Sequence, residues 1–546
     1  MKRSLKDLDS DVVEAFSGFD YELTLKLLSD ACTADAIAVR LIARGHNYNR
    51  PKSMFSTAMR SDVHRGMSAD VTLLDRLVQD EQVESSAVLR VALRRAAEFG
   101  VCISGETYRR VQHETSPSPF ETAVLLDESL LRAPWEEWDL TGRRDAKHFL
   151  VERGVALFPR TSGSARVALA HSLIHALELT PQWDIAAPYA EALRTRSLSN
   201  GHLRHMPAHI ALLRGDYGQV VSDCLAACRL NAVRLASGLP FAQFGQYIAH
   251  DLHTVVVAAC NLGSPGLSLS AAEALESAMM FMEGKLEGAE SERLVMFRSI
   301  RAQVLLRFGR WRSARAALAS FQMDSADSVA KTVYCYVETV ALANMGLVDE
   351  ARRALDSLYE SLSQVAPERL FFNNRYVDIL TVMAHVAEAE VRFHDGALEA
   401  AWEGFERAIR CELTIRFDEP WPLLLPPRQA YAALLAESGA IDEARLLALG
   451  DLGIEPTSAN VSHPCNAWSM GLLREIGVSP VYQRRFDEMW LRASSETRLL
   501  RSSCSCSASF RLSPEGPEGD DVSVSRIDAL TRLANWFDDE RMKEIS

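Results

Sequence analysis

The stretch ANMGLVDEARRAL, residues 343–355, carries the pattern that decides the fold. It reads as the end of one helix, a turn at Gly346, and the start of a second helix with small and apolar residues at helical spacing. Glycine suits the left-handed residue that closes a helix, and small side chains let the second helix approach its partner closely. Similar stretches turn on Gly215, Gly309, Gly396 and Gly439. The chain is therefore expected to contain a series of helix–turn–helix units.

Helix–turn–helix units stacked at about 34 residues are the tetratricopeptide pattern. Here the spacing drifts, with 37 residues from Gly309 to Gly346 and 50 from Gly346 to Gly396, so the repeats are degenerate. Residues 294–308 and 381–393 have the apolar spacing of amphipathic helices, and strand-like alternation is almost absent. We therefore predict an all-α solenoid of degenerate tetratricopeptide-like repeats, curved around a pocket.

The pattern changes towards both ends of the chain. Residues 1–120 are expected to be helical without clean repeats, and residues 121–495 to form the array that carries the histidine cluster. Residues 496–526 are rich in Ser, Pro, Gly and Asp, which predicts a disordered linker. Residues 527–546 form one short amphipathic helix, which is expected either to dock on the array or to bind a partner.

Composition excludes several classes of partner. The 73 acidic and 59 basic residues give a net charge of −14, which argues against nucleic acid or an anionic membrane surface. No apolar run approaches the 18 residues of a membrane-spanning helix, and no signal peptide is visible. The 10 cysteines form no CxxC motif, which is typical of reduced thiols, and we predict a cytoplasmic protein.

The histidines are placed in pairs. His171 and His175 lie one helical turn apart in ALAHSLIHALELT, as do His205 and His209 in GHLRHMPAHIALL. The second pair follows the first by 34 residues, one tetratricopeptide period, so the pairs should face each other on neighbouring helices. A third pair follows in YIAHDLHTVV. The candidate metal ligands are His171, His175, His205, His209, His250 and His253.

Imidazole ligands favour copper, iron or zinc over magnesium or calcium. We favour copper or iron and keep zinc as a possibility. Glu178 follows His175 by three residues and is expected to complete the ligand set or to act as a catalytic base. His202 and Asp251 are expected to lie behind the ligands and to orient them.

Two functions of different classes follow from this arrangement. The first is a metal-dependent oxidoreductase that acts on a small molecule or peptide, with a zinc hydrolase using Glu178 as its variant. The second is a non-catalytic scaffold that binds a protein or peptide partner in its groove, the histidines being polar lining. A single histidine is more often a hydrogen-bonded core residue, but three pairs at repeat spacing favour a metal site.

Several motifs, in order along the chain, resemble those of the tetratricopeptide repeat protein 38-like family. They are GHNYNRP (residues 45–51), LLDESLLRAPWEEWD (125–139), AHSLIHALELTP (170–181), GHLRHMPAHI (201–210), YIAHDLH (247–253), FDEPWPLLLPPRQAYAALL (417–435) and CNAWSMGLL (465–473). The resemblance implies an α-helical array. It also implies that the family's marked positions are His171, His175, His202, His205, His209, His250 and His253.

Overall fold

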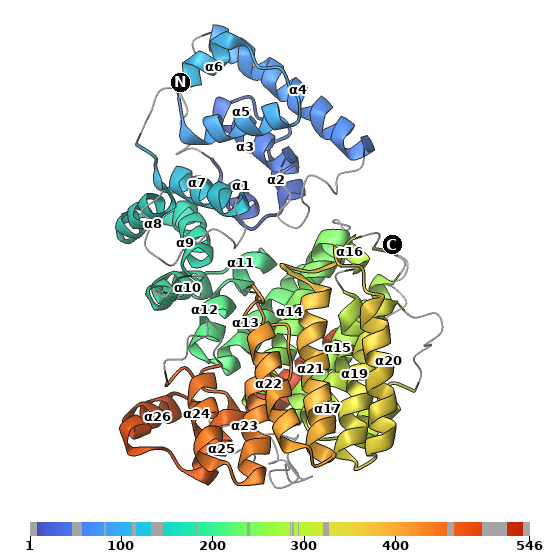
Figure 1. The fold of residues 1–546 in the computed structure, drawn as a ribbon. Coiled ribbons are helices and arrows are strands. Elements are labelled where there is room, and N and C mark those ends of the chain that lie inside the picture. Colours follow the sequence, from blue (N-terminus) through green and yellow to red (C-terminus); the bar gives the residue numbers. More distant parts are fainter. Residues whose placement is uncertain are drawn as a thin grey trace. The chain divides into compact units, whose positions relative to one another are not determined.

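The computed structural model of the chain is all-helical apart from one short strand pair (Figure 1). It describes residues 8–45, 57–80, 83, 85–111, 116–132, 146–178, 180, 183–236, 241–283, 285–286, 289–292, 294–319, 327–416, 418–455, 463–493 and 521–538. In that part of the chain, the only strands are β1 (Leu370–Phe371) and β2 (Asn374–Arg375), which pair antiparallel. The prediction of an all-α chain is confirmed. No helix among the described residues combines the length and apolar character needed to cross a membrane.

The chain divides into two compact units, Met1–Ile210 and Ala211–Ser546. The boundary predicted near residue 120 falls inside the first unit, at the start of its seventh helix. The elements of the first unit are α1 (Ser10–Ser17), α2 (Tyr21–Leu27), α3 (Ala34–Gly45), α4 (Thr57–Gln79), α5 (Ala87–Glu98), α6 (Gly105–Val111), α7 (Pro119–Arg132), α8 (Ala146–Leu157), η3 (Phe158–Arg160), α9 (Gly163–Leu177), η4 (Trp183–Ala186), α10 (Ala187–Arg194), α11 (Gly201–His205) and α12 (Pro207–Arg214).

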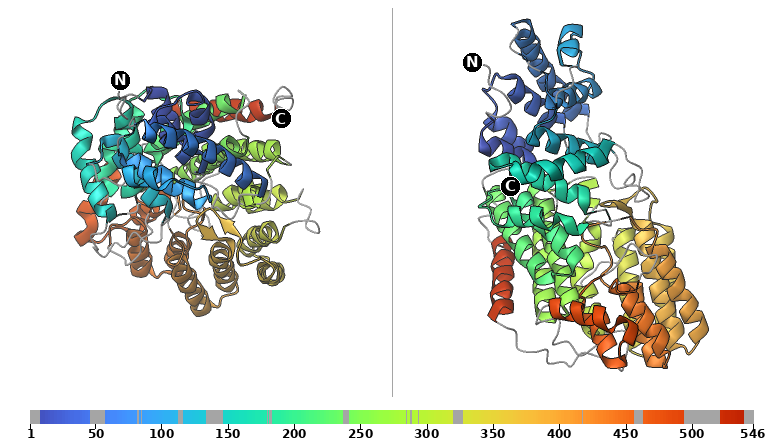
Figure 2. Two further views of the ribbon diagram at one scale, coloured as in Figure 1. Left: turned by 90° about the horizontal axis from the view of Figure 1, so that it is seen from above. Right: turned by 90° about the vertical axis from the view of Figure 1, so that its left-hand side faces the viewer.

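The second unit is built largely from antiparallel helix pairs that follow one another along the chain (Figures 1 and 2). Its elements are α13 (Tyr217–Ala236), α14 (Phe241–Leu262), α15 (Pro265–Met282), α16 (Ala289–Glu292), η5 (Val295–Ser299), α17 (Ile300–Arg307), α18 (Trp311–Ala317), α19 (Ser328–Asn344), α20 (Val348–Ser363), α21 (Tyr376–His394), α22 (Leu398–Glu412), α23 (Pro427–Ser438), α24 (Ile441–Asp451), α25 (Ala467–Ile476), α26 (Pro480–Arg492) and α28 (Asp521–Asp538).

The turn glycines named from the sequence all adopt positive φ, with values of 73° at Gly215, 66° at Gly309, 76° at Gly346, 82° at Gly396 and 90° at Gly439. Gly439 closes α23 in the left-handed conformation, where a side chain would be strained. At Gly215 an added Cβ would also collide with the carbonyl oxygen of Pro464. Glycine is therefore required at these turns for steric reasons.

The small residues of the ANMGLVDEARRAL stretch lie between packed helices, as their spacing indicates. Ala343 on α19 and Ala351 on α20 are fully buried, and both belong to one apolar cluster with Val391 of α21. Val348 and Leu355 pack against this cluster at its edge. Three successive helices thus share one core, which accounts for their close side-by-side arrangement in Figure 1.

A buried polar network ties α23, α24 and α25 together at the carboxyl end of α24. Asp451 Oδ2 accepts hydrogen bonds from Gln429 Nε2 (2.9 Å), Asn466 Nδ2 (2.9 Å) and Ser469 Oγ (2.6 Å), and its Oδ1 lies 2.8 Å from His463 Nδ1. Burial raises the pKa of Asp451, but His463 and the hydrogen bonds lower it further, so the net pKa is below the ordinary value. The carboxylate is therefore the ionised centre of the network.

The terminal helix α28 docks within the second unit, against α15 and α13. It begins at Asp521, six residues before the predicted start at residue 527, so 521–526 are helical rather than part of the linker. The remaining linker residues, 496–520, lie outside the described residues. Leu530 is fully buried, Leu533 nearly so, and the Arg526 guanidinium donates to the Gly218 carbonyl at 3.1 Å.

We expect Leu530→Asp to release α28 and lower the melting temperature. Burial of a leucine side chain contributes about 1.5–3 kcal/mol, and a carboxylate at a fully buried position is strongly disfavoured. Asp528→Ala, at an exposed position of the same helix, is the control. An unchanged melting temperature for Leu530→Asp would show that α28 contributes nothing to the stability of the second unit.

Candidate metal centre

The first histidine pair lies on a helix that is buried on all sides. Every residue of α9 from Val167 to Leu177 is buried, including His171 and His175, whose ring centroids are 4.9 Å apart. A helix that is apolar all round belongs in a protein interior. Two imidazoles inside such a helix must find polar partners or metal ions there, because a buried unpaired polar group is costly.

The other three histidines of the first unit lie on α11 and the start of α12. Asn200 caps α11 by accepting from the Leu203 amide at 3.0 Å, and its own amide donates to the Gly18 carbonyl at 3.2 Å. Pro207 cannot donate a helical hydrogen bond, and the helix is interrupted between His205 and Pro207. This arrangement fixes the two short helices against the end of α1 and aims their histidines at α9.

Five imidazoles form one continuous cluster. The ring of His175 lies 4.9 Å from that of His171, 5.9 Å from His202 and 5.2 Å from His209. His205 lies 4.9 Å from His209 and 6.5 Å from His202. The 34-residue spacing therefore correctly brought the two pairs together, as expected for side chains on packed neighbouring helices.

His171, His175 and His202 form the first group able to hold an ion, since their ligand atoms lie within 4.8 Å of one another. His171 Nε2 and His202 Nε2 are 3.1 Å apart. Burial, followed by the neighbouring imidazoles, lowers the pKa of both His171 and His202 well below 6.5. Both rings are therefore neutral near pH 7, which is the form that binds metals.

Glu178, at the carboxyl end of α9, joins His175 to His209. Its Oε1 lies 2.9 Å from His175 Nδ1, and its Oε2 makes a second, very short contact with His209 Nδ1. Burial raises the pKa of Glu178, but His209 and His175 outweigh that effect, so the net pKa is below its ordinary value. An ionised carboxylate only accepts, so both Nδ1 atoms donate to it. His175, Glu178 and His209 form a second group within 4.8 Å.

Asp127 of α7 is a site residue that the sequence analysis missed. Its Oδ1 lies 4.0 Å from His171 Nδ1, and burial raises its pKa to about 7 against the opposing effects of Ser172 and His175. Neither of these two atoms has a hydrogen-bond partner. A carboxylate behind the Nδ1 of a histidine is a common support for a metal ligand. The available signal was an acidic residue inside the apolar run LLDESLL.

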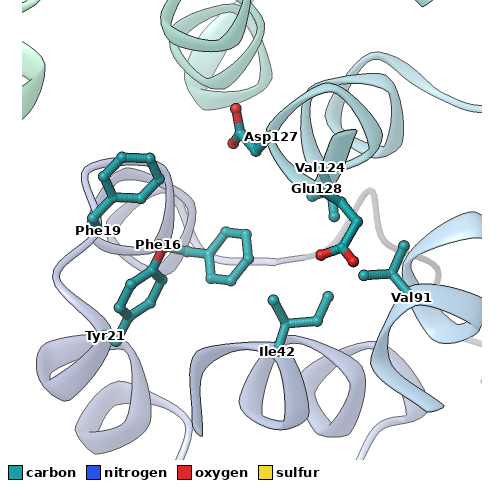
Figure 3. Close-up of a pocket in the computed structure, with 8 residues that line it drawn as sticks. All are labelled: Phe16, Phe19, Tyr21, Ile42, Val91, Val124, Asp127 and Glu128. Atoms are coloured by element: carbon teal, nitrogen blue, oxygen red, sulfur yellow. The ribbon is translucent and has the colours of Figure 1, made fainter. Parts of the chain in front are cut away.

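A small cavity lies beside this carboxylate, with room for about one water molecule. Figure 3 shows Phe16, Phe19 and Ile42 among its walls, with the carboxylates of Asp127 and Glu128 pointing in opposite directions. Phe19 follows the end of α1 with a φ of 57°. Its ring lies 4.9 Å from the ring of His171 and 4.8 Å from that of His202, so it covers both imidazoles.

The third histidine pair and Asp251 lie on α14 in the second unit. His250 Nε2 lies 3.1 Å from Glu419 Oε2, and His253 packs 4.6 Å from the Phe297 ring. Burial lowers the pKa of His253 to about 3. Asp251 Oδ2 accepts from Asn231 of α13 at 3.1 Å. Within their own unit, these side chains therefore have hydrogen-bond and ring partners of their own.

We expect the protein stripped of metal to lose stability as the pH falls below 6.5. His171 and His202 bind protons more weakly in the folded state, so the unfolded state binds more protons and the unfolding free energy decreases. Each group contributes up to about 1.4 kcal/mol per pH unit. Urea unfolding between about pH 5 and 7 measures this slope. The variant with both histidines changed to Gln should give a shallower slope, and an equal slope would contradict the assignment.

Comparison with models of known protein families gave no match, and comparison with curated sequences gave no significant match.

Proposed function

We propose that this protein is a transition-metal-dependent enzyme whose first ion is held by His171, His175 and His202. The observation that carries the proposal is the 3.1 Å approach of His171 Nε2 to His202 Nε2. Two imidazole nitrogens bound to one tetrahedral ion at roughly 2.0–2.1 Å lie roughly 3.3 Å apart. The two nitrogens therefore need little movement to share an ion.

His175 supplies the third ligand through Nε2. Its Nδ1 donates to Glu178, which in the neutral ring leaves the lone pair on Nε2. Asp127 stands behind Nδ1 of His171 and is positioned to hold that ring once the proton resides on Nδ1. Two of the three ligands are thus oriented by carboxylates, which is the usual support of histidine ligands.

The proposed chemistry is the oxidation of a small molecule or peptide. An all-nitrogen ligand set suits copper or iron, and such an ion supplies one-electron transfer when bound. The buried cluster keeps bulk water away, and Phe19 covers two of the rings. The adjoining cavity has room for about one water molecule, so it favours a small reactant at that side of the cluster.

A zinc hydrolase with Glu178 as general base is less well supported by this geometry. Both carboxylate oxygens of Glu178 contact histidine Nδ1 atoms, and the side chain is fully buried. A general base needs to reach the proton that it abstracts from substrate or water. Glu178 is therefore better placed to orient His175 and His209 than to take a proton from water.

Metal content of the untagged protein tests the proposal. We expect near-stoichiometric copper or iron in the wild type and loss of that ion in the double variant His171→Gln, His202→Gln. Glutamine keeps helix propensity and rough size without strong metal ligation. His385→Gln on α21 is the control for the same chemical change elsewhere. A folded double variant with wild-type metal content would reject this site.

A second candidate, a tetratricopeptide-like scaffold for a protein or peptide, is favoured by one observation. The turn glycines all have positive φ and precede successive helix pairs. We propose on this basis that the second unit is a degenerate repeat array related to the tetratricopeptide repeat protein 38-like family. Capture of a defined peptide by metal-free protein would support the scaffold role, and a metal requirement for turnover would support the enzyme.

A further inference from the structure

Two groups of potential ligands share one residue. His171, His175 and His202 form one group, and His175, Glu178 and His209 form the other. His175 is the only member of both. Its ring contacts that of His171 at 4.9 Å and that of His209 at 5.2 Å, so it stands between the remaining members.

The two nitrogens of His175 face different groups. Nδ1 lies 2.9 Å from Glu178 Oε1, within the second group. Nε2 lies across the ring and is the ligand atom proposed for the first ion. We infer that the centre is dinuclear, with a second transition-metal ion held by His175 Nδ1, Glu178 and His209, and with His175 bridging the two ions as imidazolate. This inference rests on the proposed function.

Hydrogen bonds mark where the second ion would enter. Glu178 accepts from Nδ1 of His175 and from Nδ1 of His209, so a proton now lies on each of the two contacts. Binding of the ion replaces both protons, which leave to solvent, and forms bonds from each Nδ1 and from a Glu178 oxygen. The 2.9 Å nitrogen–oxygen separation must widen by only a few tenths of an ångström to fit roughly 2.0–2.2 Å bonds.

Charge favours the same arrangement. A buried divalent ion needs nearby negative charge, since its desolvation is costly. The Glu178 carboxylate supplies one charge, and a bridging imidazolate supplies another by losing its proton. Neither charge is available to an ion bound only by neutral histidines. An imidazolate bridge would place the two ions about 6 Å apart, given roughly 2.0 Å bonds on each side of the ring.

Titration of the metal-free, full-length protein with Cu(II) tests the bridge. We expect two equivalents to bind, and the electron paramagnetic resonance signal to decrease as the second binds, because an imidazolate couples the two spins. His209→Gln should bind one equivalent and keep its full signal. Glu178→Gln should also lose the second equivalent. His385→Gln should behave like the wild type, and circular dichroism should confirm folding of each variant.

The outcomes separate this inference from the proposed function. One equivalent in both wild type and His209→Gln would overturn the second ion while leaving the first site intact. Two equivalents with a full, uncoupled signal would overturn the bridge through His175. No bound copper in folded wild-type protein would overturn both the dinuclear centre and the metal-dependent function.

Discussion

Asp451→Ala is expected to lower the unfolding free energy of the second unit by about 3–5 kcal/mol, the range seen when a buried charged network loses its centre. Asp451 and Asn466 are fully buried, and Gln429 and Ser469 nearly so. Four donors converge on this carboxylate, and alanine accepts from none of them. The loss should appear as a lower urea midpoint.

Asp442→Ala on the same helix is the matched control. Its side chain is 88% exposed and pairs only with Arg445 at the surface, so its loss should cost little. A decrease below about 1 kcal/mol for Asp451→Ala would contradict the structural role of the network. Because the pKa of Asp451 is lowered in the folded state, its contribution is complete above its unfolded pKa and is lost as acid protonates the folded carboxylate.

His175→Gln is expected to remove both ions, the largest effect of any single change in the cluster. His175 belongs to both ligand groups, and glutamine cannot bind two ions through the two sides of one ring. Metal analysis should give less than a tenth of the wild-type content, and any metal-dependent turnover should be lost with it. The fold should persist because glutamine can still donate a hydrogen bond to Glu178.

His205→Gln is the informative comparison for this variant. The His205 ring lies 4.9 Å from that of His209, but His205 belongs to neither of the two ligand groups. It should therefore retain most of its metal. If His175→Gln keeps one full equivalent while folded, the first ion does not need this side chain, and the shared-ligand arrangement is wrong.

The sequence predicted the helical fold well because its signals are local. Apolar spacing reports which face of a helix is buried, and a glycine such as Gly439 reports a left-handed turn that no other residue adopts easily. The division at Ile210 was not predictable in this way. It depends on how many contacts cross each point of the chain, which a single sequence does not reveal.

The site was predictable where helical periodicity defines it. His171, His175 and His209 came together because 34 residues separate equivalent positions. The importance of His202 was underestimated, since its approach to His171 depends on how Asn200 anchors α11 to the end of α1. Asp127 was missed because its helix packs on α9 through contacts that no spacing in the sequence records.

The central claim is that the histidine cluster binds a transition metal, and X-ray absorption at the metal edge of the untagged protein tests it most directly. The account predicts a bound copper or iron ion with imidazole nitrogen ligands at roughly 2.0 Å and the multiple-scattering pattern of several histidine rings. It also predicts a second metal about 6 Å away. Folded protein with no metal above background, or with a metal bound mainly by sulfur, would contradict it.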